Sequence, residues 1–392
     1  MNAKRIFISI LMVAMTTTLF AKQSKDKLAQ SISANFEKRI RSDKNANTGI
    51  LLVHSPTLGI HLKTVANPDS TVLVHPDQPY HFASIGKTVT SVLVAILYEK
   101  GLVSFDDFIS NYLDESVLEG LHVYKGVDYS NEIRIRHLLN HSSGLPDPYT
   151  DKNIQKISLM DRMIAEPDTF WTPLETITWG KQQLRPKFKP GKGFHYSDSN
   201  YELLGLIIEK ITGMKFHEAL HQFIFTPLEM NNTCLLFHSE PKVKNAFSMV
   251  DLYHKGLNLS KAKSISMSCA AGGIVSSSED MLKFHKAIVE GKIIGKEIFE
   301  KMCDFAKMGP SIRYGYGMMH FRFMMMPRKY DIWGNSGSIG AFMYYNPGMD
   351  VYVIGSFHKM GYQVQPIFYI FNILRKIEKK QVRQKKQLAS NL

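Results

Sequence analysis

The spacing of apolar residues changes along the chain from strand-like to helical and back. Two apolar runs, over 49–54 and 58–66, flank Ser55-Pro56-Thr57 and predict a β-hairpin. A longer apolar run over 84–97 predicts a buried helix, which Gly101 is placed to end. Near the C-terminus, runs rich in aromatic and β-branched residues predict strands over 316–326, 330–333, 341–345 and 351–357.

Helices dominate between these strand regions, from about residue 84 to about residue 230. Thr172-Pro173-Leu174-Glu175 and Ser277 with Asp280 are typical of helix N-termini, and Ser199 with Glu202 predicts a further capping box. The pattern as a whole predicts an α+β fold. One antiparallel sheet, flanked by helices, is built from both chain ends, and a mainly helical lobe is inserted between them.

The chain of 392 residues is long enough for one large domain or two closely packed ones. We expect residues 22–375 to form the folded unit. Its α/β lobe would comprise about 45–95 and 265–375, and its helical lobe about 96–264. At 44% hydrophobic and 21% charged residues, the composition is that of an ordinary globular protein.

The first residues have the features of a targeting segment. Lys4 and Arg5 precede a short apolar run, and a small residue, Ala21, follows it. This order predicts a signal peptide over 1–21 and an exported protein, periplasmic or extracellular. An uncleaved anchor is the alternative, although threonines interrupt the run. No cysteine follows the run, which argues against a lipoprotein anchor.

Basic residues are concentrated at the C-terminus. The formal net charge is +13, and seven basic residues against one acidic residue lie from Arg375 onward. An apolar helical segment over 367–374 precedes them, so this basic tail, over 376–392, is a candidate for weak contact with a membrane surface. The alternative is a helix packed on the sheet with a solvated end. No nucleic-acid-binding module is recognisable.

The few cysteines and the histidine spacing limit other chemistry. Three cysteines, Cys234, Cys269 and Cys303, leave at least one unpaired. His137 and His141 are four residues apart but lack a third ligand, so we expect neither a metal nor another cofactor. His141 is expected to be structural.

Candidate catalytic residues lie in three short segments. Ser84 and Lys87, three residues apart at a helix N-terminus, can bring an amine to a hydroxyl nucleophile. Tyr196 and Asp198 lie on a short loop that follows the turn Pro190-Gly191 and precedes a helix. The third segment is Trp333-Gly334-Asn335-Ser336-Gly337-Ser338-Ile339-Gly340.

In this order the three segments resemble the serine beta-lactamase-like hydrolases, in the branch of class C beta-lactamases, D-alanyl-D-alanine carboxypeptidases and related esterases. The resemblance covers about 45–360 and implies a two-lobed fold with the site between the lobes. It implies that Ser84 forms an acyl-enzyme and that Lys87 and Tyr196 transfer protons. It also implies an oxyanion hole made of the backbone N–H groups of Ser84 and Ser338.

Two positions depart from the family pattern. Asp198 stands where class C enzymes usually carry asparagine, and should hold Lys87 charged; the cation should in turn make the Tyr196 phenolate accessible. Asn335 replaces a lysine or histidine that helps to bind a substrate carboxylate. Asp198, Asn335, Ser336 and Gly337 are therefore expected to bind or orient substrate.

The substrate expected from these residues is a small molecule or peptide with a carbonyl acyl group. Because Asn335 carries no charge, neutral esters or amides are favoured. A true beta-lactamase or D-alanyl-D-alanine carboxypeptidase remains an alternative, as does a non-hydrolytic penicillin-binding or sensing protein.

Overall fold

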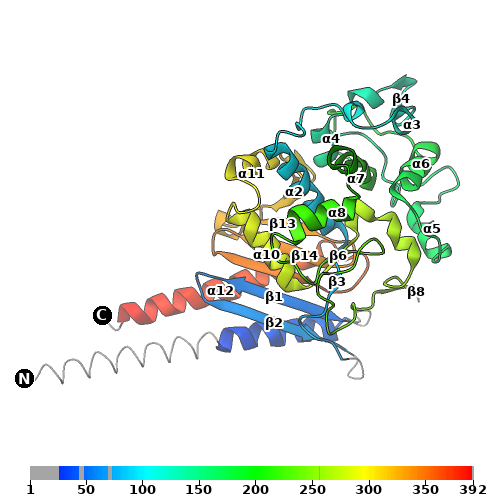
Figure 1. Ribbon diagram of the computed structural model, residues 1–392. Coiled ribbons are helices and arrows are strands. Elements are labelled where there is room, and N and C mark those ends of the chain that lie inside the picture. The colour runs from blue at the N-terminus through cyan, green and yellow to red at the C-terminus, as the bar shows by residue number, and fades with distance from the viewer. Residues whose placement is uncertain (1–25, 44–47, 69–72, 256, 391–392) are drawn as a thin grey trace, which may run out of the picture.

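The computed structural model describes residues 26–43, 48–68, 73–255 and 257–390. The predicted signal peptide lies outside these residues. The predicted fold class is confirmed: helices flank an eight-stranded antiparallel sheet with the order β10-β11-β12-β13-β14-β15-β1-β2. Strands from the start of the chain thus complete a sheet begun by strands from its end. Figure 1 shows this sheet below a mainly helical lobe.

The strands of the large sheet are β1 (Gly49–Ser55), β2 (Ile60–Ala66), β10 (Ala306–Lys307), β11 (Ile312–Tyr314), β12 (Met319–Phe321), β13 (Ile332–Ser336), β14 (Ala341–Asn346) and β15 (Val351–Ser356). Strand β1 lies between β2 and β15 and pairs Leu52 with Ile354. Its side chains alternate between two separate apolar clusters, because successive residues of a strand point to opposite faces. Both faces of the sheet are therefore covered.

One face of the sheet is covered by two terminal helices. A helix over residues 26–41, which the apolar pattern did not lead us to predict, packs there with α12 (Gln365–Ser390). Phe36 of the first helix lies 5.7 Å, between ring centroids, from Tyr369 of the second. Helix α12 continues past residue 376, where the basic tail was predicted to begin.

The opposite face carries α10 (Ser278–Val289) and the long helix α2 (Gly86–Glu99), which leads from the sheet into the helical lobe (Figure 1). The other α-helices are α3 (Glu115–Leu118), α4 (Ile135–Leu139), α5 (Leu159–Ala165), α6 (Pro173–Gln183), α7 (Asp198–Thr212), α8 (Phe216–Leu220), α9 (Cys269–Gly272) and α11 (Lys296–Met302).

Short 3-10 and π turns and three small sheets complete the fold. The turns are η1 (Ala83–Ile85), η2 (Ile109–Asn111), η3 (Ser130–Glu132), η4 (His221–Phe225), η5 (Lys263–Met267) and η6 (Arg328–Tyr330). The remaining strands are β3 (Tyr80–His81), β4 (Val123–Tyr124), β5 (Val127–Asp128), β6 (Cys234–Leu235), β7 (Tyr253–His254), β8 (Leu257–Asn258) and β9 (Ile274–Ser276).

Two of the predicted helix caps are confirmed and one is wrong. Thr172 and Ser277 accept hydrogen bonds from the backbone N–H groups three residues later, at the starts of α6 and α10. The prediction fails for Ser199 and Glu202, because α7 already begins at Asp198. The Ser199 hydroxyl donates instead to the Pro146 carbonyl, and Glu202 is buried against α9.

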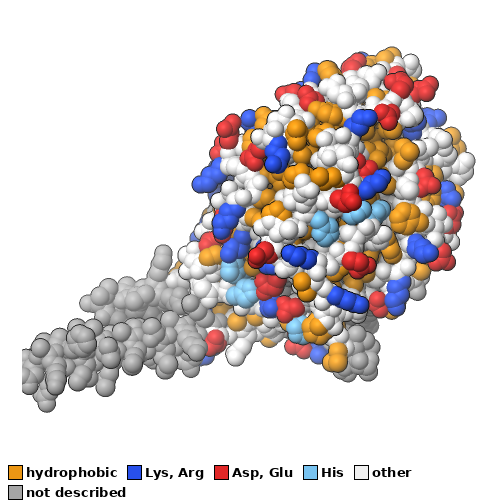
Figure 2. Space-filling view, viewed as in Figure 1, with side chains coloured by type: hydrophobic (Ala, Val, Ile, Leu, Met, Phe, Trp, Pro, Cys, Tyr) orange, Lys and Arg blue, Asp and Glu red, His pale blue; other side chains and the backbone are white. Residues whose placement is uncertain are grey.

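The three cysteines are all free; Cys269 is buried, and Cys234 and Cys303 are half-buried. Within the described residues, no helix is both long and apolar enough to cross a membrane. On the face of the molecule seen in Figure 2, acidic and basic side chains are interspersed.

Candidate active site

Ser84 lies in a tight turn, η1, which leads directly into α2. Ala83 has φ 47°, a left-handed conformation that is unfavourable for a residue with a side chain and is often found at functional sites. Gly337, after β13, packs against this turn: a Cβ atom there would lie 2.7 Å from the Phe82 carbonyl oxygen. The sheet thus supports the turn that presents the Ser84 hydroxyl.

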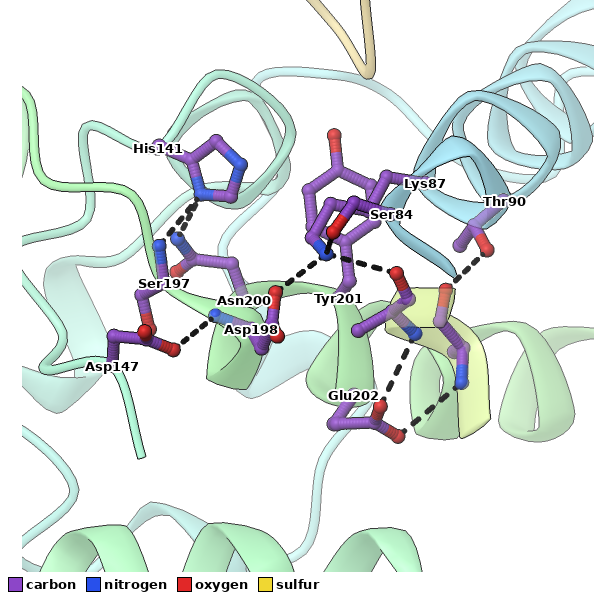
Figure 3. A network of polar contacts seen from close by, with 12 residues as sticks. Ser84, Lys87, Thr90, His141, Asp147, Ser197, Asp198, Asn200, Tyr201 and Glu202 are labelled. Atoms are coloured by element: carbon purple, nitrogen blue, oxygen red, sulfur yellow. Dashed lines mark hydrogen bonds and ion pairs between the residues drawn. The ribbon is translucent and has the colours of Figure 1, made fainter. Parts of the chain in front are cut away.

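Lys87, one helical turn after Ser84, is fully buried and has three partners. Its Nζ lies 3.3 Å from Ser84 Oγ and donates to the Ala271 carbonyl at 2.8 Å. The third partner is the Asp198 carboxylate, whose Oδ1 lies 2.5 Å away. Figure 3 shows the ammonium between the Ser84 hydroxyl of η1, a carbonyl of α9 and the Asp198 carboxylate of α7. The structure therefore brings Asp198, which is distant in the sequence, to the neighbouring residues Ser84 and Lys87.

This ion pair fixes the charge of Lys87. Burial alone would lower the pKa of the ammonium, but the Asp198 carboxylate and the Tyr196 phenol oppose burial, and the pKa is raised above its ordinary value. The expectation that Asp198 holds Lys87 charged agrees with this geometry.

Tyr196 joins the same cluster from the loop before α7. The Lys87 Nζ lies 5.0 Å from the centroid of its ring, and the His141 ring packs on the ring at 4.2 Å between centroids. Burial raises the pKa of Tyr196, and Lys87 only partly offsets this effect. The geometry therefore does not support an accessible phenolate in the resting site, because burial, together with the Asp198 carboxylate, outweighs the effect of the Lys87 cation on the pKa of Tyr196.

The two predicted oxyanion-hole donors are available. Among the described residues, neither the Ser84 N–H nor the Ser338 N–H has a hydrogen-bond acceptor, and both residues are half-exposed. The Ser338 carbonyl accepts from Gly361 N–H at 2.8 Å, and the Ile339 carbonyl accepts from Lys359 N–H at 2.8 Å. The loop after β15 thus orients the peptide groups that follow β13.

The Lys359 side chain anchors this loop. Its Nζ lies 2.7 Å from an Asp43 carboxylate oxygen, just after the first helix, and Tyr362 also contacts Asp43. The terminal helix over 26–41 is in this way connected to the oxyanion-hole side of the site.

The side chains of Asn335 and Ser336 do not face a substrate. Asn335 is fully buried, and its amide nitrogen lies 3.2 Å from the Ser84 carbonyl oxygen and 3.0 Å from that of Gly317. The Ser336 hydroxyl bonds to Tyr344 on the other face of the sheet, at 2.8 Å. The substrate-orienting role expected of Asn335, Ser336 and Gly337 disagrees with this geometry. Asn335 and Gly337 contact the turn that carries Ser84, and Ser336 contacts Tyr344 within the sheet.

Three buried polar residues of this region were not predicted to contribute to the site. Glu202 accepts hydrogen bonds from the N–H groups of Ala270 and Ala271, and Ala271 in turn holds Lys87. Asp147 accepts from the Asp198 N–H at 3.1 Å. The sequence offers little indication of these roles for Glu202 and Asp147, because a single carboxylate in a helix or loop is usually exposed to solvent.

His141 is the third of these residues and is structural in its contacts. Its Nδ1 accepts from the Ser197 N–H at 3.1 Å and lies 3.0 Å from the Asn200 amide nitrogen (Figure 3). Burial, together with the nearby Lys87, holds the pKa of the imidazole well below its usual range, so the ring is neutral. His141 therefore fixes the loop that carries Tyr196.

No group of three or more histidine, cysteine, aspartate or glutamate side chains suited to a metal occurs within the described part of the chain. The chemistry of the cluster is that of hydroxyl, amine, phenol and carboxylate groups.

These features belong to the serine hydrolases in which a Ser-x-x-Lys helix and a tyrosine loop lie beside a strand of an antiparallel sheet. The sequence profile named Beta-lactamase matches residues 45–367, and the chain belongs to the beta-lactamase family. It is 30% identical over 162 residues to "Penicillin-binding protein 4*" of Bacillus subtilis, a match that covers 39% of this chain and 30% of that protein. The matched stretch is thus less than a third of that relative.

Two solved structures have the same fold. D-amino acid amidase from Ochrobactrum anthropi SV3, complexed with L-phenylalanine amide, has a TM-score of 0.72 at 20% identity, covering 91% of this chain and 99% of that one. EstCE1, described as a hydrolase with promiscuous acyltransferase activity, has a TM-score of 0.68 at 18% identity, covering 90% of this chain and 99% of that one. At these identities the likeness is one of fold.

Asn335→Ala tests the structural role of this amide. The variant removes the side-chain donor of the Ser84 carbonyl and leaves the Gly317 carbonyl with the Thr88 hydroxyl alone, so the free energy of unfolding should fall by about 1–3 kcal/mol. The kcat/KM values for a neutral ester and for a carboxylate-bearing substrate should fall by the same factor. Ser336→Ala is the matched control, because it loses a bond on the far face and should keep its activity. A selective loss of the carboxylate substrate would contradict this role.

Glu202 should make stability depend on pH. Burial raises the pKa of this carboxyl from 4.5 to about 8, so its contribution to stability is complete below the unfolded pKa and is lost as the pH rises through about 8. Urea unfolding of the wild type across this window should show a decline that is shallower in Glu202→Gln. Glu115→Gln, at an exposed glutamate, is the control and should follow the wild type. Parallel curves for wild type and Glu202→Gln would contradict the assignment.

Proposed function

We propose that the protein is an exported serine hydrolase that cleaves a neutral ester or amide through an acyl-enzyme on Ser84. The observation that carries this proposal is the contact between the Ser84 hydroxyl and the buried Lys87 ammonium, beside two free backbone N–H donors. An acyl-enzyme requires a nucleophile with a proton acceptor and a site for the carbonyl oxygen. Membership of the beta-lactamase family supports the reaction class.

The proton path begins with Lys87. As Ser84 attacks the carbonyl carbon, its hydroxyl proton passes to Lys87 while Lys87 passes a proton to Asp198, 2.5 Å away. In this transfer Lys87 need not be neutral beforehand, and no resting phenolate is required. The N–H groups of Ser84 and Ser338 receive the developing negative charge.

Tyr196 serves the leaving group. When the tetrahedral intermediate collapses, the phenol donates its proton to the departing oxygen or nitrogen, Lys87 restores the phenol proton, and Asp198 returns a proton to Lys87. Water then attacks the acyl-enzyme along the same path in reverse and regenerates Ser84. General acid and base catalysis of this kind contributes typically ~10²–10⁴-fold in rate.

The charges around the site favour neutral substrates. Asn335 supplies no charge and is buried, and the nearby Lys359 is paired with Asp43. A beta-lactam or a D-alanyl-D-alanine terminus carries a carboxylate that benefits from a cation, and neither of these two positions offers one. Two proteins of the same fold, an amidase and EstCE1, are consistent with ester or amide cleavage.

Export rests on the sequence alone. The basic and apolar segment over 1–21 supports a secretory signal. The substrate we propose is a small molecule or peptide met outside the cytoplasm.

Ser84→Ala tests the reaction. The variant should remain folded but lose turnover of p-nitrophenyl acetate and covalent labelling by a fluorophosphonate, since removal of a nucleophile costs several orders of magnitude. Wild type should turn over the ester faster than nitrocefin or a D-Ala-D-Ala peptide. Full labelling of the alanine variant would exclude Ser84 as the nucleophile. Stable acylation by nitrocefin without ester turnover would instead indicate a penicillin-sensing protein.

A double-mutant cycle tests the proton path. Lys87→Ala and Tyr196→Phe should each slow acylation strongly, and the double variant should be little slower than the slower single variant, because groups on one path are not additive. Stopped-flow acylation rates measure this, with thermal melts to confirm that each variant is folded. Losses that multiply fully would mean that the two residues do not share a proton path.

A further inference from the structure

An exposed apolar surface lies outside the group of residues that form the candidate active site. The loop between β12 and β13 carries the methionine tip, Met324, Met325 and Met326. Met325 is fully exposed, Met324 is 65% exposed and Phe368, on α12, is 64% exposed. Large apolar side chains gathered on a surface usually mark an interaction site.

The loop and α12 form one continuous surface. Phe323, beside the methionine tip, contacts Phe371 with ring centroids 4.9 Å apart. Phe368 lies three residues before Phe371, so both project on the same side of the helix. Lys329 and Tyr330, after the tip, contact Glu378, about two turns further along α12 than Phe371. In Figure 1, α12 projects from the α/β lobe on the side away from the helical lobe.

Basic residues surround this surface. Among the described side chains, the exposed cations of the loop and of α12 are Arg322, Arg328, Lys329, Arg375, Lys379 and Arg383. Two acidic residues lie among them: Glu378 is paired with Lys329, and Asp331 is 15% exposed and lies 3.9 Å from the His320 ring nitrogen. The charge of this surface is therefore positive, in contrast to the interspersed charges of the face seen in Figure 2.

The backbone conformation of Met325 indicates that its side chain does not contribute to the stability of the fold. Met325 has φ 66°, a turn conformation that glycine or asparagine adopts at lower cost. An exposed methionine at such a position gains no burial in compensation.

We propose that the methionine tip and the exposed side of α12 bind the surface of an anionic lipid bilayer. The tip and Phe368 would enter the interface between headgroups and acyl chains, and the surrounding cations would contact the headgroups. A second copy of this chain fits less well, because a two-fold contact through this surface would place cations against cations. An anionic lipid surface offers acyl chains to the apolar side chains and negative headgroups to the cations. This assignment is independent of the proposed catalytic function.

Local immersion tests the proposal in the full chain. The tryptophan fluorescence of Met325→Trp should be quenched by vesicles of phosphatidylcholine and phosphatidylglycerol that carry brominated acyl chains. Ile154→Trp, at a 92% exposed position of the helical lobe, is the matched control and should add no quenching to that of the native tryptophans. Because residues 1–21 are present in both variants, they cannot account for a difference between them. Equal quenching of the two variants would overturn the proposal.

Binding measurements complete the test. Met324→Ser/Met325→Ser should reduce co-sedimentation with the anionic vesicles at least tenfold, added salt should weaken wild-type binding, and vesicles of phosphatidylcholine alone should bind less. Ile154→Ser should bind like wild type, and hydrolysis of a soluble ester should be unchanged in all variants. A dimer in solution that the double variant abolishes, without any effect on vesicle binding, would assign the surface to a second copy and overturn the proposal.

Discussion

The buried ion pair between Lys87 and Asp198 is the interaction on which the site depends. An ammonium without solvent exposure is stable in a protein only when opposite charge and hydrogen-bond acceptors surround it. The structure supplies the Asp198 carboxylate from α7 and the Ala271 carbonyl from α9. Helices α2, α7 and α9 are therefore held in one arrangement beside Ser84, because together they must supply the partners of the Lys87 ammonium.

Other buried polar groups maintain this arrangement. Glu202 accepts the two N–H groups of α9, while Lys87 and Thr90 of α2 donate to the carbonyls of the same segment. His141 and Asp147 fix the loop and the first residue of α7. A buried network of this kind is costly when it is half satisfied, so a change in one member affects the position of the others.

The sheet contributes in a different way. Gly337 packs closely on the turn that carries Ser84, and the Asn335 amide bonds to the Ser84 carbonyl, so β13 is connected to Ser84. The loop after β15 orients Ser338, and Asp43 anchors that loop. The side of the site that carries Ser338 is thus built by backbone geometry, for which side-chain identity gives little indication.

The sequence by itself determined the fold class and a sheet built from the N-terminal hairpin and the C-terminal strands. It also determined the segments that carry Ser84 and Lys87 and that carry Tyr196 and Asp198. These follow from local periodicity and from short motifs, which depend on neighbouring residues. Only the tertiary structure decided that Asn335 is buried and that burial raises the pKa of Tyr196. It also decided that Glu202 faces α9 rather than capping its own helix, and that a helix over 26–41 covers the sheet. Burial and long-range hydrogen bonds set these properties, and both arise from residues that are distant in the sequence.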